Sequence, residues 1–215
     1  MAAYTTIDNP ELYFQTKLYT GTEDELAITL DGDENMQPDF VWIKRRATSQ
    51  NHFIFDSVRG ATKYINSNTT DPEYTQAQGL KSFDTDGFTL GTWDGPNDDV
   101  TNVAWCWKAG TSFTNDASAT SVGNTDSSGS ASSTAGFSIA KWVGAGASLD
   151  IQVKHGLSVK PAVMFTKNIE EAGGNDWAVY HHKNTSAPET DYLKLSDDTA
   201  TTDQAEIWHD TEPTS

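Results

Sequence analysis

The sequence predicts an all-β protein: an antiparallel β-sandwich or jelly roll made of two related units, of which the second is incomplete. Three observations support this fold class. Short strand-like runs alternate with turn residues at the spacing of roughly 8–12 residues that is typical of sandwiches. No window of about eleven residues or more has the periodicity of a helix. The second half of the chain also repeats the pattern of the first half.

The clearest expected strand is residues 26–30, Leu-Ala-Ile-Thr-Leu, which alternates with period two. Further runs are rich in β-branched and aromatic residues, as strands are: residues 40–44, 53–55, 88–90 and 103–107. Turn residues separate these runs, at residues 31–33, 86–87 and 94–97. Residues 84–88, Asp-Thr-Asp-Gly-Phe, are expected to form a hairpin turn between two strands.

The strongest signal is an internal duplication, in which residues 137–167 repeat residues 14–44 at an offset of 123 (137 − 14). Aromatic, glycine, apolar, proline and lysine positions coincide at this offset, for example Phe14 with Phe137 and Trp42 with Phe165. Further on, residues 51–55 lie over residues 175–179 after a one-residue gap. A fixed-period duplication of a β-rich unit describes a modular architecture rather than an enzyme with one catalytic centre.

The duplication divides the chain into a first unit with an N-terminal arm (residues 1–113), a linker (114–135) and a second, truncated unit (136–215). The linker is rich in Ser, Thr, Gly and Ala, a composition that buries too little apolar surface to order itself. An ordered crossover on a sheet surface is the alternative. The second unit ends before any counterpart of residues 87–108, so it should expose a sheet edge and an apolar face. Either the natural chain continues, or a neighbouring subunit completes the fold.

The chain is strongly acidic, with 14 Lys and Arg against 31 Asp and Glu and a net charge of −17. This charge argues against binding to nucleic acid or to an anionic membrane, since both need a positive field. No apolar run approaches the roughly 20 residues of a membrane span, and the N-terminus lacks the features of a signal peptide. Cys106, the single cysteine, is expected to be a small buried hydrophobe.

An acidic loop offers the best candidate metal ligands. Asp31, Asp33 and Asn35 bring several oxygen atoms into a short segment, which could suit Ca²⁺. The spacing does not match a dedicated calcium loop, and these residue types are also the usual residues of turns. We favour structural turns, because the corresponding position of the second unit carries Lys154 and His155 instead.

A second loop offers a candidate ligand site formed by Trp93, Asp94 and Asn97. An exposed indole beside an acid and an amide can stack on a sugar ring and bind its hydroxyls, and loops on a rigid sandwich often carry binding residues. The alternative is that Trp93 makes a subunit contact or packs within the fold. The strand tryptophans Trp42, Trp105 and Trp107 are most simply core residues.

Candidates for catalysis are weak, and we expect the chain not to be an enzyme. Asp84 and Asp86 could form a carboxylate pair, but glycosidase chemistry needs two carboxylates across a cleft, which the sequence does not indicate. His181 and His182 should point to opposite faces of a strand, so they cannot readily bind one metal ion. The basic cluster 44–46 is expected to be a solvated loop, and Arg59 a lone cation in a turn.

Several longer segments resemble a repeated, concanavalin-like β-sandwich module of marine bacteriophage virion proteins, commonly described as tail-fibre or structural proteins. In the first half these are residues 9–22, 36–44, 55–63, 82–91 and 103–110, and in the second half residues 136–146, 155–167 and 176–182. The resemblance covers nearly the whole chain, from Tyr13 to Ser215.

The resemblance implies a virion structural protein, assembled in the host cytoplasm and located on the phage particle, as a tail fibre or appendage. The implied partners are other virion proteins, further copies of the chain and a host-surface glycan, with no nucleic acid and no membrane insertion. A capsid decoration protein without receptor binding is an alternative, and a depolymerase of surface polysaccharide is a third.

Overall fold

The computed structural model describes residues 7–144, 146, 150–171 and 175–215. These residues form sixteen β-strands and four short helical segments, and every strand pair is antiparallel. The prediction of an all-β antiparallel fold is therefore confirmed. Among the residues that the structure describes, no helix is long and apolar enough to cross a membrane.

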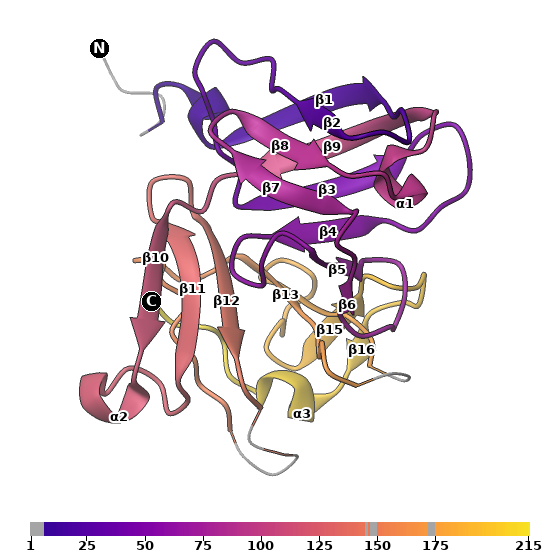
Figure 1. The fold of residues 1–215 in the computed structure, drawn as a ribbon. Coiled ribbons are helices and arrows are strands. Elements are labelled where there is room, and N and C mark those ends of the chain that lie inside the picture. The colour runs from indigo at the N-terminus through magenta and orange to yellow at the C-terminus, as the bar shows by residue number, and fades with distance from the viewer. Residues whose placement is uncertain (1–6, 145, 147–149, 172–174) are drawn as a thin grey trace.

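The N-terminal half is a sandwich of two sheets (Figure 1). One sheet has six strands in the order β1 (Phe14–Thr20), β9 (Thr101–Trp107), β3 (Phe40–Arg45), β4 (Phe53–Asp56), β5 (Lys63–Asn66) and β6 (Tyr74–Thr75). The other has three strands in the order β2 (Leu26–Ile28), β8 (Gly87–Leu90) and β7 (Leu80–Asp84). The core between the sheets includes Ile28, Val41, Ile43, Phe55, Leu80, Phe88, Leu90, Ala104 and Cys106, all at most 5% exposed.

The sequence pattern explains this core. Apolar residues alternate along β3, so Val41 and Ile43 point into the sandwich and are fully buried. β7 and β8 form the predicted hairpin, in which Asp84 pairs with Gly87. Gly87 has a positive φ of 109°, and a Cβ atom there would lie 1.9 Å from the carbonyl oxygen of Ile28. The turn therefore needs glycine.

The C-terminal half contains two smaller sheets. The three-stranded sheet has β10 (Thr111–Asn115), β11 (Ser127–Ser132) and β12 (Phe137–Trp142), and the four-stranded sheet has β13 (Val163–Thr166), β14 (Ala178–His181), β15 (Asp191–Lys194) and β16 (Thr202–Asp203). The helical segments are η1 (Pro10–Leu12), α1 (Asp94–Asn97), α2 (Ala117–Thr120) and α3 (Ala205–Trp208).

The segment 114–135, expected to be a flexible linker, instead contains the end of β10, helix α2 and all of β11. β11 is the central strand of its sheet, and its small side chains explain how it fits there. A Cβ atom on Gly129 would lie 2.1 Å from the carbonyl oxygen of Ile139 and 2.7 Å from the ring of Phe113. The composition that predicts disorder in isolation thus suits a strand packed closely between two others.

The tryptophans of β3 and β9 differ from the prediction. Trp42, Trp105 and Trp107 are half-buried and lie on the face of the six-stranded sheet opposite the sandwich core, where the rings of Trp42 and Trp105 meet edge-on. Cys106, in the same strand, is fully buried as predicted.

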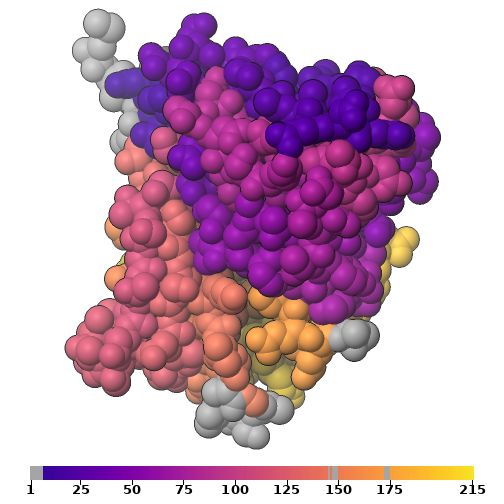
Figure 2. All heavy atoms as spheres, in the orientation of Figure 1, coloured from indigo at the N-terminus to yellow at the C-terminus, as the bar shows by residue number. Residues whose placement is uncertain are grey.

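The C-terminal half packs on this second face of the six-stranded sheet. Figure 2 shows the two halves lying against each other on the surface of the molecule. Trp177 is the central contact: it is 5% exposed, packs with Ile54 and Ile65, and donates its indole N–H to the carbonyl oxygen of Asn66 at 2.9 Å. A backbone bond from Glu73 N–H to the carbonyl of Ile169 joins the halves again. The six-stranded sheet is thus covered on both faces at β3, β4 and β5.

The pairing of β3 with β4 recurs in β13 with β14. Phe40 pairs with Asp56 and Trp42 with Ile54, while Val163 pairs with His181 and Phe165 with Val179. The offset is 123 on the first strand (163 − 40) but 125 on the second (181 − 56). The sequence alignment, which sets residues 51–55 over 175–179, is therefore one residue out of register here.

The next two strands recur as well. Lys63 pairs with Thr75 and Tyr64 with Tyr74, and at an offset of 128 (191 − 63) Asp191 pairs with Asp203 and Tyr192 with Thr202. We call strands β3–β6 the first block and strands β13–β16 the second block. The growing offset marks insertions in the connecting loops, which leave the strand register unchanged.

Candidate functional site

The acidic loop predicted to bind Ca²⁺ is held by contacts within the chain. Asp31, Asp33 and Asn35 are exposed; the Asp31 carboxylate forms an ion pair with Lys17, and the backbone N–H of Asp33 donates to the Glu11 carboxylate. In the described part of the chain, no three His, Cys, Asp or Glu side chains converge in a way that could hold a metal ion. These contacts fit the interpretation of the loop as a structural turn.

The predicted ligand residues Trp93, Asp94 and Asn97 do not form a common binding surface. Trp93 is half-buried and packs edge-on against Phe53, with its ring centroid 4.9 Å away. Asn97 is fully buried: its amide group donates to the carbonyls of Asp24 and Gly91, and its oxygen accepts from the Thr22 N–H. Only Asp94 is exposed, so Asn97 cannot contact a ligand.

The carboxylates considered for catalysis also form hydrogen bonds within the protein. Asp84 accepts hydrogen bonds from the hydroxyls of Ser82 and Thr89, both at 2.7 Å, and Asp86 accepts from the backbone N–H of Met36. These bonds fix the hairpin of β7 and β8. His181 and His182 lie with ring centroids 5.6 Å apart and tilted by 53°, and Nδ1 of His181 accepts a hydrogen bond from the backbone N–H of Lys183.

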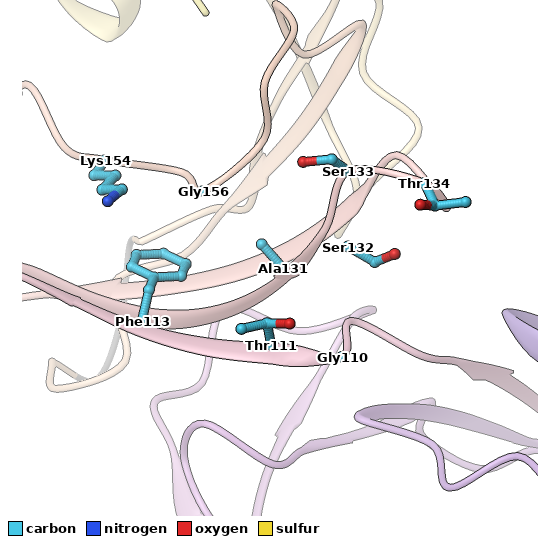
Figure 3. A pocket seen from close by; sticks show the side chains of 9 residues that line it. All are labelled: Gly110, Thr111, Phe113, Ala131, Ser132, Ser133, Thr134, Lys154 and Gly156. Carbon is cyan, nitrogen blue, oxygen red and sulfur yellow. The ribbon is translucent and has the colours of Figure 1, made fainter.

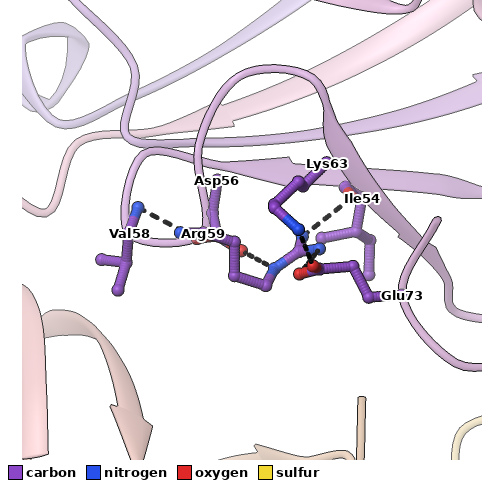
Figure 4. Close-up of polar contacts among 6 residues, drawn as sticks. All are labelled: Ile54, Asp56, Val58, Arg59, Lys63 and Glu73. Atoms are coloured by element: carbon purple, nitrogen blue, oxygen red, sulfur yellow. Dashed lines mark hydrogen bonds and ion pairs between the residues drawn. The ribbon is translucent and has the colours of Figure 1, made fainter. Parts of the chain in front are cut away.

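Two arginines have a structural role that the sequence did not predict. Arg45 is nearly buried and pairs with Asp98 at 2.9 Å. Arg59 is 5% exposed, and its guanidinium contacts Asp56 at 2.5 Å, Glu73 at 3.4 Å and the carbonyl of Ile54 at 3.0 Å, as Figure 4 shows. Asp56 also accepts from the backbone N–H groups of Val58 and Arg59, so every charge in this cluster has a partner.

The best candidate for a binding site is a pocket that contains none of the predicted site residues. It lies between the three-stranded sheet and the segment 154–156 (Figure 3). Its volume is about 430 Å³. It is lined by residues from the start and middle of β10, the end of β11 and its following turn, and the facing segment: Gly110, Thr111, Phe113, Ala131, Ser132, Ser133, Thr134, Lys154 and Gly156.

Three kinds of binding group converge in this pocket. The ring of Phe113 forms an apolar wall, and the Lys154 ammonium lies over that ring at 5.7 Å from its centroid. Hydroxyl groups of Thr111, Ser132, Ser133 and Thr134 supply donors and acceptors. The lining residues include no carboxylate, so Lys154 is a cation available to a ligand in a chain of net charge −17.

A glycine controls the shape of the pocket wall. Gly156 has a positive φ of 77°, and a Cβ atom there would come within 2.7 Å of both the Phe113 ring and the Ala131 side chain. The close approach of residue 156 to Phe113 therefore depends on the missing side chain. Sequence reasoning missed this site because Phe113 lies just before the expected linker and Lys154 is 41 residues further on (154 − 113).

Comparison with known proteins supplies the family but no activity. No curated protein and no solved structure matches the chain significantly. Residues 9–215 match the sequence model of a family described as a domain of unknown function, DUF7483. This match spans nearly all of the residues that the structure describes, including both blocks and the pocket. The chain therefore belongs to the DUF7483 family.

Proposed function

We propose that this chain is a structural and binding protein, composed of two related β-units, which binds an acidic saccharide in the pocket formed by Phe113 and Lys154. The observation that carries this proposal is the convergence of an aromatic face, an ammonium group and several hydroxyls on one hollow of the surface. Binding rather than catalysis is favoured because the carboxylates already accept hydrogen bonds within the fold, Asp84 from Ser82 and Thr89 and Asp86 from the Met36 N–H.

Each component suits a different part of such a ligand. The face of an aromatic ring packs on the C–H groups of a sugar ring, as the Phe113 ring could do here. The hydroxyls of Ser132, Ser133 and Thr134 can exchange hydrogen bonds with sugar hydroxyls. The Lys154 ammonium favours a carboxylate, such as that of a uronic or sialic acid, over a neutral sugar.

The resemblance to phage virion modules suggests where such binding would be used. A sugar-binding β-protein with exposed strand edges suits a tail fibre or other appendage that meets the host surface. A capsid decoration protein remains the alternative placement. Gold-labelled antibodies against the chain, viewed on intact particles by electron microscopy, would distinguish tail labelling from capsid labelling.

The binding proposal is tested by titrating the protein with glucuronate-containing and matched neutral oligosaccharides in a calorimeter. We expect weak binding of the acidic saccharide. Lys154→Gln should lower this affinity about tenfold, which is the scale of one charge-assisted hydrogen bond, and should change neutral-sugar binding little. Phe113→Ala should abolish binding of both.

Lys183→Gln is the matched control, because Lys183 is exposed and outside the pocket. Its binding should equal that of the wild type. Circular dichroism must show that each variant is folded. Unchanged affinity in both Lys154→Gln and Phe113→Ala, or an absence of binding in the wild type, would overturn the pocket assignment.

A further inference from the structure

The edge of β13 is uncovered at the place where its counterpart in the first block is covered. β3 has a strand on each side, β9 and β4, whereas β13 pairs only with β14 among the described strands. Its side chains Val163 and Phe165 are 41% and 54% exposed. Their counterparts at the 123-residue offset, Phe40 and Trp42, instead pack against Trp107 and Trp105 of β9.

The hydrogen-bonding direction of the β13 backbone is set by its pairing with β14. The His182 N–H donates to the carbonyl of Ala162, so residues 162, 164 and 166 face β14. The peptide groups of Val163 and Phe165 therefore point to the open edge. The Ser57 N–H donates to the carbonyl of Asp39 in the same way, which directs Phe40 and Trp42 toward β9. The open edge of β13 thus has the geometry that receives a strand in the first block.

A second open edge lies on β1, at the end of the six-stranded sheet. β1 is seven residues long, and β9 is its only partner among the described strands. The Lys108 N–H donates to the carbonyl of Tyr13, so residues 15, 17 and 19 face β9. The peptide groups of Phe14, Thr16 and Leu18 point outward, and Phe14 and Leu18 are 40% and 57% exposed.

The two edges present their apolar side chains on corresponding faces. Phe14 packs on Trp107, which also packs on Phe40, so Phe14 lies on the Phe40 face of its sheet. Val163 and Phe165 lie on the same face of the second block, because they correspond to Phe40 and Trp42. Directly opposite residues of antiparallel strands share a face, so these side chains would meet if β1 and β13 paired.

We propose that the occupant of the β13 edge is a second copy of this chain, whose β1 strand pairs with β13 in an antiparallel manner. This inference deepens the assembly part of the proposed function and does not depend on the saccharide pocket. Long, apolar, unprotected strand edges tend to pair with another chain. Each copy has one β1 edge and one β13 edge, so the contact is head-to-tail and builds a ring or a filament.

The pairing would join the six-stranded sheet of one copy to the four-stranded sheet of the next. It would cover four of the exposed large hydrophobic side chains: Phe14, Leu18, Val163 and Phe165. Because each copy carries a charge of −17, association should be measured at an ionic strength of about 0.15 M, where screening limits repulsion to about 8 Å.

The test is the solution mass, by light scattering, of the wild type and of two single variants, Leu18→Lys on β1 and Phe165→Lys on β13. We expect the wild type to exceed the monomer mass of 23.4 kDa at least twofold and each variant to be a monomer. Val143→Lys is the matched control, since Val143 is 74% exposed and lies outside both edges; it should assemble like the wild type.

A mixture of the two variants identifies the partner edge. Leu18→Lys retains an intact β13 and Phe165→Lys retains an intact β1, so the mixture should form a dimer with one copy of each. A monomeric wild type, an oligomer that survives either substitution, or a mixture that stays monomeric would overturn the proposal. Saccharide binding by the folded monomeric variants is measured separately, so failure of assembly and failure of the pocket are distinguishable.

Discussion

The first and second blocks have the same strand pairing but different surroundings. In the first block, β3 lies between two strands, and its side chains Phe40 and Trp42, the counterparts of Val163 and Phe165, are half-buried. In the second block, β13 has one neighbour among the described strands, and Phe165 is 54% exposed. The comparison separates what determines the register of paired strands from what determines whether a sheet edge is buried. Local alternation and turns set the register, whereas burial of an edge depends on a strand from a distant part of the chain or from another chain.

The largest expected difference concerns thiol reactivity at covered and uncovered positions. Burial raises the pKa of the Cys106 thiol from 9.0 to about 12, so at pH 8 its thiolate fraction falls about a thousandfold. A thiol introduced by Phe165→Cys, in the monomeric Leu18→Lys background, should be alkylated by iodoacetamide at least about a thousandfold faster than Cys106. Peptide mass spectrometry measures both rates.

Unfolding in urea should expose Cys106 and bring the two rates together. Equal rates in the folded protein would show that the core of the sandwich does not shield Cys106, and would remove the contrast between this buried position and the exposed position 165.

The next effect concerns the buried charged cluster around Arg59 in the first block. Arg59→Ala leaves the buried carboxylate of Asp56 without its ionic partner, although Glu73 keeps its ion pair with Lys63, and should lower the free energy of unfolding by about 3–5 kcal/mol. Asn184 lies three residues after the end of β14, as Arg59 lies three residues after the end of β4, and Asn184→Ala should cost less than about 1 kcal/mol. Urea denaturation measures both, and similar losses would contradict the difference between the blocks.

A comparable loss is expected where the halves meet. Trp177→Ala removes the side chain that packs on Ile54 and Ile65 and should cost about 3–5 kcal/mol. Trp177→Phe keeps most of the packing and loses the hydrogen bond to Asn66, so it should cost clearly less. Calorimetric scans should show one transition for the wild type; if Trp177→Ala unfolds like the wild type, the halves do not stabilise each other through this contact.

The smallest effect compares the half-buried Tyr19 with the fully buried Tyr180. The Tyr19 hydroxyl donates to the carbonyl of Pro96 at 2.7 Å, and burial raises the pKa of Tyr19 strongly. The Tyr180 hydroxyl has no protein partner among the described residues, and burial raises the pKa of Tyr180 as well. Tyr19→Phe should cost about 1 kcal/mol, whereas Tyr180→Phe should be neutral or slightly stabilising. Denaturant midpoints measure this, and the opposite order would contradict it.

The sequence predicts where the strands lie better than it predicts which segments pack against them. Residues 26–30, 40–44, 53–55, 88–90 and 103–107 all contain strands, because alternation and β-branched residues are local signals. The linker prediction differs from the structure because β11 is stabilised by β10 and β12, which its own composition cannot reveal. The partial burial of Trp42 and Trp105 likewise depends on the C-terminal half, far along the chain.

The candidate sites were harder to predict for the same reason. Asp94 and Asn97 are close in sequence, yet Asn97 is buried by contacts with residues 22 and 24. The isolated Arg59 proved to be paired with Glu73, fourteen residues further on. Phe113 and Lys154 meet only because the segment 154–156 folds back over the β10–β11 hairpin. Residue type suggests chemistry, but contacts between distant segments decide which side chains remain free.

The most direct measurement is residue-resolved hydrogen exchange along β13, in the wild type and in Leu18→Lys. The substitution lies on β1, which belongs to a different sheet from β13 within one chain. If β1 of a second copy covers β13, the amides of Val163 and Phe165 should be protected in the wild type and should exchange rapidly in the variant. The amides of Met164 and Thr166, which face β14, should remain protected in both. Equal exchange of Val163 and Phe165 in the two proteins would contradict the pairing of β1 with β13.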